Sequence, residues 1–310
     1  MEGENPTRSC GWTIWSSDIS GRALSRPNQQ VSARTAADRP RHGRRCKLNT
    51  PLLFEICVGS AQGAISAQEA GVNRVELCDN LIEGGTTPSA GAVQVARQHI
   101  DIGLNVIVRP RGGDFCYSNV EFETMLRDVE IAAESGVDGI VIGILNPNGS
   151  IDVERTGALI ERIRPLPVTF HRAFDMTADP HRALEDLISL GVDRVLTSGR
   201  EVSALEGIDL IAGLIEKAAG RIVVMPGGGI TERNVAKVVA GTGAREIHVA
   251  AASSVPGRMT YRNPNAFMGG ELRPPEFSHD VTDVNRVKAF IQAVTTPIQP
   301  NRGKTGEVRR

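Results

Sequence analysis

From residue 52 to residue 294 the chain alternates between short apolar runs rich in β-branched residues and longer stretches with the apolar period of a helix. The short runs predict strands and the longer stretches predict helices. Boundary signals support several helices, such as Gly71 at the end of the first and Ser89 before the second. The expected strands are 52–58, 74–79, 104–111, 139–145, 167–174, 194–198, 222–225 and 246–251. The expected helices are 61–70, 90–99, 121–135, 152–164, 180–190, 208–219, 232–240 and, after a long loop, 284–294.

Eight strand–helix units in succession predict a single-domain α/β fold of the (β/α)8 type, the TIM barrel. A weak repeat precedes four of the strands, as GVNRVEL, GVDGIVI, GVDRVLT and GAREIHV. A doubly wound open sheet is the alternative, but it normally has fewer units, and no GxGxxG motif opens the first strand–helix turn. The pattern therefore favours the barrel.

The two ends of the chain lack this pattern. Residues 1–50 carry nine Lys and Arg against four Asp and Glu, a net charge of +5, and show no hydrophobic period. We interpret 1–50 as a basic disordered extension, for which a transit segment and an extended gene start are both open. The barrel is expected over 51–298, followed by a disordered tail over 299–310.

Composition narrows the class of protein. The chain has 310 residues, 40% of them apolar, and a net charge of −1, so we expect neither nucleic acid nor a membrane as a partner. Its five cysteines are an odd number and contain no CxxC pair. This usage indicates reduced thiols in a cytoplasmic protein and gives little support to a structural zinc site.

Polar residues at the carboxyl ends of the expected strands are the candidates for chemistry, because barrel enzymes place their reactive groups there and keep deeper layers aliphatic. Glu55 and Cys57 share one face of the first strand, and Glu76 and Cys78 repeat this Glu-x-Cys arrangement on the second. The two cysteines are either site residues or small buried hydrophobic residues. His248, in the eighth strand, either joins the site or fills the barrel.

The third and fifth strands add basic residues. Arg109 and Arg111 lie on one face of the third strand, the fifth strand carries His171, and Asp175 follows this strand. Buried charges are costly alone, but carboxylates and guanidinium groups can pair across a barrel mouth. The candidate catalytic residues are therefore Glu55, Glu76, Arg109, Arg111, His171 and Asp175.

Three glycines follow the seventh strand, in the sequence MPGGGIT. Backbone N–H groups at this turn of a barrel often bind phosphate or another anion near the start of the next helix. We expect Gly227, Gly228 and Gly229, with Arg172, to form an anion site. A tight turn without a ligand is the alternative.

Several segments together resemble the CutC family of copper-homeostasis proteins: EICV, RVELCDNLIEGGTTPS, VIVRPRGGDFCYS, LPVTFHRAFDM, DRVLTSG and GRIVVMPGGGIT. The resemblance covers about residues 54–294. It implies a cytoplasmic (β/α)8 barrel that forms homo-oligomers, dimers or tetramers, and that binds Cu(I). The cysteines proposed as ligands in that family correspond to Cys57 and Cys78.

Two functional hypotheses follow. The first is a copper-homeostasis protein that binds Cu(I) through Cys57 and Cys78, because thiolates are the ligands that this soft ion prefers. The second is a barrel enzyme that acts on a small anionic metabolite, phosphorylated or not, since the arginines and the glycine turn suit an anion better than a cation. A barrel that binds a ligand without turnover is a third reading, so enzymatic activity stays open.

The assignment of residues 1–50 to an extension outside the barrel makes a direct prediction. A chain that starts at Lys47 should keep the melting temperature of the full chain, because no barrel contact is removed. Differential scanning calorimetry of the two proteins checks this, and a lower melting temperature of the shortened chain would place part of the extension in the fold.

Overall fold

The computed structural model describes residues 52–266, 268 and 277–295. The expected extension 1–50 and tail 299–310 lie outside the described residues. Eight strands form one parallel sheet in the order β7-β6-β5-β4-β3-β2-β1-β8, and β7 and β8 lie next to each other, so the sheet nearly closes into a barrel. The strands are β1 (Leu53–Val58), β2 (Arg74–Leu77), β3 (Gly103–Ile107), β4 (Gly139–Ile142), β5 (Val168–Phe170), β6 (Arg194–Thr197), β7 (Val223–Pro226) and β8 (Glu246–Ala250).

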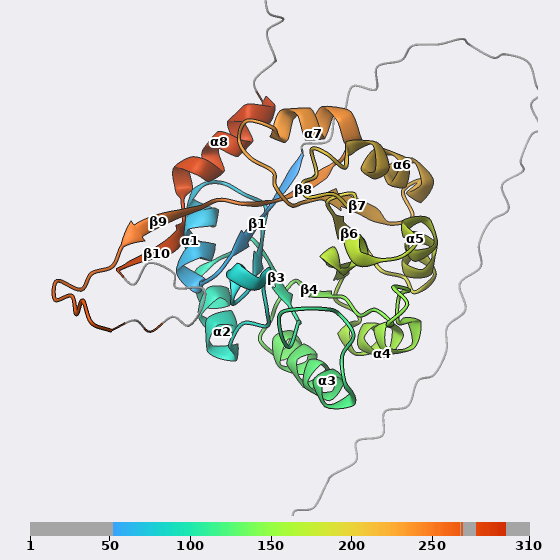
Figure 1. Ribbon diagram of the computed structural model, residues 1–310, viewed down its shortest axis with the longest axis horizontal. Coiled ribbons are helices and arrows are strands. Elements are labelled where there is room, and N and C mark those ends of the chain that lie inside the picture. The colour runs from blue at the N-terminus through green and yellow to red at the C-terminus, as the bar shows by residue number, and fades with distance from the viewer. Residues whose placement is uncertain (1–51, 267, 269–276, 296–310) are drawn as a thin grey trace, which may run out of the picture. The chain divides into compact units, whose positions relative to one another are not determined.

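A helix follows each strand and the helices form a ring around the barrel, as Figure 1 shows. The expected (β/α)8 fold is thereby confirmed. The helices are α1 (Ala61–Glu69), α2 (Ala90–His99), α3 (Asn119–Glu134), α4 (Val153–Ile163), α5 (Pro180–Ser189), α6 (Ile208–Ala218), α7 (Val235–Thr242) and α8 (Val284–Thr295). Two short 3₁₀ helices, η1 (Leu81–Glu83) and η2 (Arg172–Met176), follow β2 and β5.

Side-chain caps fix where several helices begin. Ser89 accepts a hydrogen bond from the Ala92 N–H and starts α2 where the sequence predicts it. Ser118 and Glu121 form a capping box, so α3 begins at Asn119, two residues before the expected start. The same box positions the Glu121 carboxylate, which accepts a hydrogen bond from Arg111 of the β3–α3 loop.

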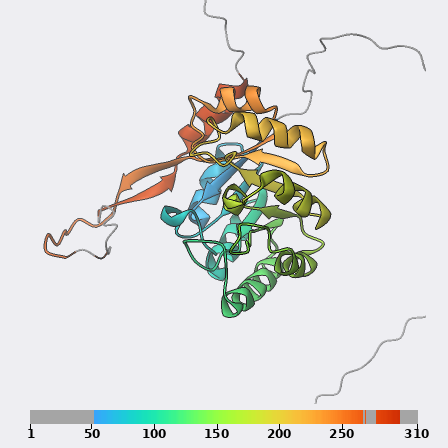
Figure 2. The same cartoon turned by 45° about the vertical axis from the view of Figure 1, so that its right-hand side comes forward.

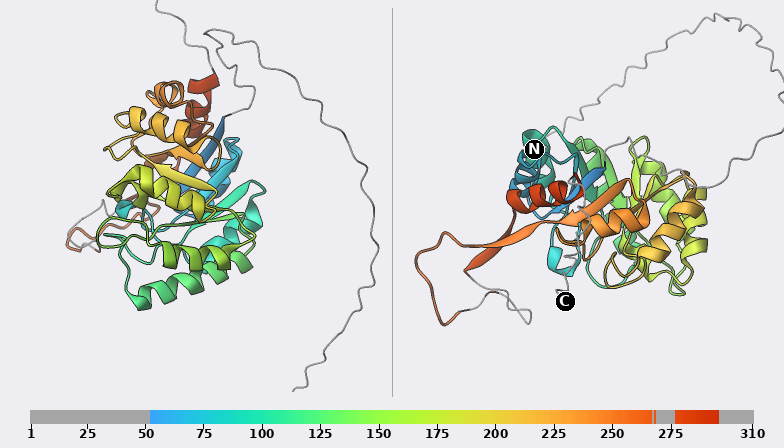
Figure 3. Two further views of the ribbon diagram at one scale, coloured as in Figure 1. Left: turned by 90° about the vertical axis from the view of Figure 1, so that its right-hand side faces the viewer. Right: turned by 90° about the horizontal axis from the view of Figure 1, so that it is seen from above.

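The sequence pattern predicted a plain loop before the last helix, and this was wrong. Strands β9 (Ala252–Pro256) and β10 (Ser278–Thr282) pair antiparallel and form a separate two-stranded sheet. The hairpin projects beyond the ring of helices (Figures 2 and 3). Its base is fixed by the Asp283 N–H, which donates to the Ala251 carbonyl at 2.7 Å, and by the Ser253 hydroxyl, which donates to the Asp283 carboxylate at 2.8 Å.

The main apolar core lies between the strands and the helices. Outward-facing strand residues such as Ile56, Leu77, Ile140 and Ile142 are fully buried there. Burial of this apolar surface is the main favourable term in folding.

The interior of the barrel is different, because the layer of side chains at the amino ends of the strands is charged. Arg74, Arg194 and Glu246 are the first residues of β2, β6 and β8. The Glu246 carboxylate accepts from Arg74 Nη2 at 2.7 Å and from Arg194 Nε at 2.6 Å. The expectation of aliphatic deep layers was therefore wrong at this level, where one carboxylate holds two guanidinium groups together.

Removal of the charge of Glu246 tests this layer. We expect Glu246→Gln to lower the free energy of unfolding by roughly 3 kcal/mol, because two buried cations lose a shared counter-ion. Urea unfolding measures the change. The matched control is Glu185→Gln, which breaks a surface pair with Arg221 and should leave the unfolding midpoint unchanged. Equal effects of the two substitutions would contradict this account.

Candidate functional site

Glu55 of β1 is the most constrained side chain in the mouth of the barrel. It is 1% exposed and is bonded by side chains of three other strands. Its Oε2 accepts from Arg74 Nε of β2 and, at 2.9 Å, from Asn105 Nδ2 of β3, and its Oε1 lies 2.8 Å from His248 Nδ1 of β8. Burial alone would raise the pKa of Glu55, but the His248 hydrogen bond and the charge of Arg74 lower it to about 2. Glu55 is therefore ionised at neutral pH.

His248 carries a positive charge in this setting. Burial lowers its pKa, but hydrogen bonds to Cys57 and Glu55 and the nearby carboxyl groups raise that pKa well above its ordinary value. As an imidazolium, His248 donates from Nδ1 to Glu55, and its Nε2 lies 3.7 Å from Glu76 Oε2. Glu55 thus fixes the orientation of this ring and, together with Cys57 and Glu76, favours its positive charge.

The two thiols predicted from the sequence meet above this layer. Cys57 Sγ and Cys78 Sγ lie 3.7 Å apart, with Cys78 buried and Cys57 partly exposed. The hydrogen bond from Cys78, together with the hydrogen bond and charge of His248, outweighs burial and lowers the pKa of Cys57 to about 5. The shared hydrogen bond and burial raise the pKa of Cys78 well above its ordinary value. The pair is therefore a thiolate, Cys57, beside a thiol, Cys78.

Glu76 completes a group that can hold a metal. Burial raises the pKa of Glu76 to about 8, against the opposing charge of His248. The ligand atoms of Cys57, Glu76 and Cys78 all lie within 4.8 Å of one another, and no other His, Cys, Asp and Glu cluster of this kind occurs among the described residues. Two sulfur ligands suit a soft cation such as Cu(I).

The opposite side of the mouth holds His171, which caps η2. Its Nδ1 accepts from the Ala173 N–H at 3.1 Å, and its Nε2 makes no hydrogen bond within the described part of the chain. The ring lies against Gly143, where any Cβ would overlap the imidazole. Burial and the charge of Arg109 lower the pKa of His171 to about 3, so this histidine is neutral.

Arg109 is 5% exposed and is held by backbone carbonyls. Its Nη1 donates to the backbone carbonyls of Glu83 and Gly85 at 2.8 and 2.7 Å, and its Nη2 donates to the backbone carbonyl of Gly113 at 3.0 Å. Its guanidinium carbon lies 5.1 Å from the ring centre of Phe115, which in turn lies 5.2 Å from that of His171. Arg109 therefore joins the pocket, as expected from its place near the carboxyl end of the third predicted strand, although β3 itself ends at Ile107.

Asp175 and Arg172 serve mainly to hold η2 against the end of β6. The Asp175 carboxylate accepts from Arg172 Nε at 2.8 Å, from the Thr197 hydroxyl at 2.5 Å and from the N–H and hydroxyl groups of Ser198. Arg172 also donates to the Ser198 hydroxyl at 2.9 Å. With its oxygens already bonded, Asp175 positions the loop around the pocket.

Arg111 is not brought to the pocket. Strand β3 ends at Ile107, four residues before the expected end, and the side chain of Arg111 turns to the capping box of α3. It donates to Glu121 at 2.6 Å and to the Cys116 carbonyl at 3.1 Å. The strand period that placed Arg111 beside Arg109 does not continue past Pro110.

The glycine turn after β7 lies beside the mouth without a helix start. The Gly227 N–H donates to the Thr197 carbonyl at 2.9 Å, and α7 begins only at Val235. Gly228 has a φ of +94°, which a residue with a side chain rarely adopts, and it passes close to the Arg172 guanidinium group. The absence of side chains here gives room to Arg172 and His248.

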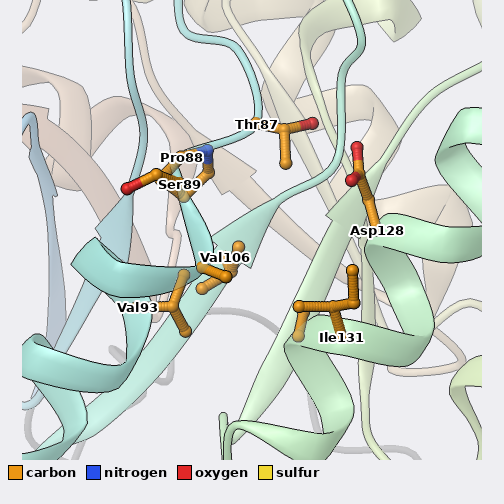
Figure 4. Close-up of a pocket in the computed structure, with 9 residues that line it drawn as sticks. Thr87, Pro88, Ser89, Val93, Val106, Asp128 and Ile131 are labelled. Atoms are coloured by element: carbon orange, nitrogen blue, oxygen red, sulfur yellow. The ribbon is translucent and has the colours of Figure 1, made fainter.

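Several of these groups line one pocket of about 280 Å³. Cys57, Glu76 and His248 lie on one side of it, and the other polar lining residues are Glu83, Arg109, His171, Arg172 and Asp175. A second hollow of similar volume lies between α2 and α3, where Figure 4 shows Thr87 facing Asp128 above Val93, Val106 and Ile131. That hollow contains no thiol or imidazole group, so the barrel mouth is the candidate functional site.

Three residues that shape the site were not among those predicted from the sequence. Arg74 and Asn105 lie on the inward face of β2 and β3, two positions before Glu76 and Ile107. Because residues two apart in a strand share a face, the alternation of the strands could have predicted both of them. Phe115 comes from the β3–α3 loop, for which the pattern gave no signal.

Comparisons with known proteins agree with one another. A model of the CutC family matches residues 52–253. Proteins named copper homeostasis protein cutC homolog from Mus musculus and Homo sapiens are each 52% identical over 238 residues, which is 77% of this chain and 88% and 87% of theirs. The crystal structure of a CutC protein from Streptococcus agalactiae superposes with a TM-score of 0.62 at 37% identity, covering 64% of this chain and 98% of that one. Among the described helices, none has the length and apolar character of a membrane span.

The link between Glu55 and His248 predicts a change in titration. Glu55→Gln should lower the pKa of His248, because the imidazolium loses its anionic partner while burial still opposes its charge. NMR titration of ¹⁵N-labelled histidine side chains measures this pKa, and the signals of the surface residue His181 should be the same in both proteins. An unchanged pKa of His248 would mean that Glu55 does not hold its charge.

Proposed function

The chain belongs to the CutC family, and from that premise we propose that it serves copper homeostasis by binding Cu(I) through the thiol groups of Cys57 and Cys78. The observation that carries this proposal is the 3.7 Å separation of the two sulfur atoms at the barrel mouth. Adjacent parallel strands hold both sulfurs, so the pair is preformed by the sheet. The names of the mouse and human relatives support a role in copper homeostasis.

The chemistry of the donor set fits a monovalent soft cation. Thiolates prefer Cu(I), whereas oxygen ligands select harder ions. The sulfur atoms are closer than two metal–sulfur bonds of roughly 2.3 Å laid end to end, so the pair suits a bent site with room for a third group. Glu76 is the third potential ligand within reach.

The charge balance of the mouth is compatible with Cu(I). Glu55 and His248 form one neutral pair, and Cys57 supplies a thiolate. The thiol of Cys78 still carries a proton, and release of this proton on binding would offset the charge of one Cu(I) ion.

Substitution of the thiols tests the proposal. We expect Cys57→Ser and Cys78→Ser each to weaken Cu(I) binding by roughly 100-fold or more, because a soft ligand is replaced by a hydroxyl. Competition with a coloured Cu(I) chelator under reducing conditions gives the affinity.

The matched control is Cys116→Ser, since Cys116 lies in the β3–α3 loop outside the thiol pair. It should bind Cu(I) as the parent protein does. Parent-like affinity in both Cys57→Ser and Cys78→Ser would refute the assignment of these thiols as ligands.

A further inference from the structure

A histidine nitrogen without a partner among the described residues, Nε2 of His171, points to a second ligand in the barrel mouth. His171 is 4% exposed and lines the pocket. Its Nδ1 accepts the Ala173 N–H, so in the neutral ring the proton lies on Nε2. That Nε2–H group makes no hydrogen bond within the described residues. A buried donor left in this state favours any ligand that brings an acceptor oxygen.

Arg109 supplies a positive charge next to this donor. Among the described residues, no carboxylate lies within ion-pair distance of Arg109, and its Nε makes no hydrogen bond. Its other nitrogens meet three backbone carbonyls, which reduce the cost of burial but carry no net charge. The carboxylate of Glu83 also lines the pocket, but it accepts from Asn80.

The other charged groups on this side are Arg172, Asp175 and Glu83. Arg172 and Asp175 form an ion pair with Nε and Oδ2 2.8 Å apart, whereas the Glu83 carboxylate is bonded to the neutral Asn80. Arg109 therefore remains a cation without an ion-pair partner among the described residues in this part of the pocket, whose wall is apolar where Ile107, Phe115 and Leu196 contribute.

We propose that this side of the mouth binds the carboxylate of a small organic acid, with His171 Nε2–H donating to one oxygen and Arg109 supplying the counter-charge. The volume of about 280 Å³ limits the ligand to a few carbon atoms, and the apolar wall contacts its hydrocarbon part. This ligand site lies in the same pocket as Cys57, on the side of β3 and β5, and adds a second chemical specificity to the barrel.

A carboxylate fits these groups better than a phosphate. A single buried arginine without an acidic partner matches one negative charge, whereas a phosphate carries nearly two. The Gly227 N–H is already bonded to Thr197, and α7 starts well past the glycine turn at Val235. The turn therefore lacks the helix start that phosphate sites of barrels use.

Binding of simple acids to metal-free protein tests this inference independently of copper. Isothermal titration with acetate, propionate and lactate, after removal of metal with a chelator, should show millimolar binding of at least one of the three. His171→Asn should weaken that binding roughly tenfold or more, since one hydrogen bond to a charged group is lost. Asparagine is a good helix cap, so its side-chain oxygen can replace Nδ1 and keep η2 in place.

His181→Asn is the matched control, because His181 lies on the surface of α5, and it should bind as the parent does. Three outcomes would overturn the inference: no binding of any of the three acids, equal binding by His171→Asn and the parent, or tighter binding of inorganic phosphate than of the acids.

Discussion

A buried carboxylate with three partners on three strands determines the interior of this barrel. A buried carboxylate such as Glu55 is ionised only if hydrogen-bond donors or opposite charges compensate for the loss of water. Arg74 of β2, Asn105 of β3 and His248 of β8 supply these contacts. The contacts extend toward the amino ends of the strands, because Arg74 also donates to Glu246, which accepts from Arg194 as well. Opposite charges therefore alternate from the base of the barrel to its mouth, and each one makes the next less costly to bury.

The consequence at the mouth is a division into two halves with different chemistry. Near β1, β2 and β8, the charge of His248 stabilises the Cys57 thiolate, and the thiol of Cys78 lies beside it. Near β3 and β5, a neutral His171 and an arginine without an acidic partner offer hydrogen-bond donors and positive charge. The first half suits a soft cation and the second suits an oxyanion, so the two hypotheses that the sequence left open concern different sides of one pocket.

Most of the fold could be predicted from the sequence, because eight strand–helix units each carry a clear hydrophobic period. The ends of elements were harder to predict where local side-chain contacts decide them, as when the Ser118 capping box starts α3 early. The β9–β10 hairpin gave no signal, since its strands are short, polar and partly exposed. Strand parity placed Glu55, Cys57, Glu76 and Arg109 in the interior, but Arg111 left that face once the strand had ended. Contacts between distant strands, such as Arg74 with Glu246, depend on closure of the sheet and could not be deduced from one strand alone.

The proposed copper site rests on two sulfur ligands that the sheet holds in place before the ion binds. X-ray absorption at the copper edge of the Cu(I)-loaded protein can test this site, because the spectrum reports which atoms surround the metal. We expect two sulfur neighbours in the parent protein and one in Cys78→Ser. A shell of nitrogen and oxygen alone, unchanged by that substitution, would contradict the account and place the metal outside the thiol pair.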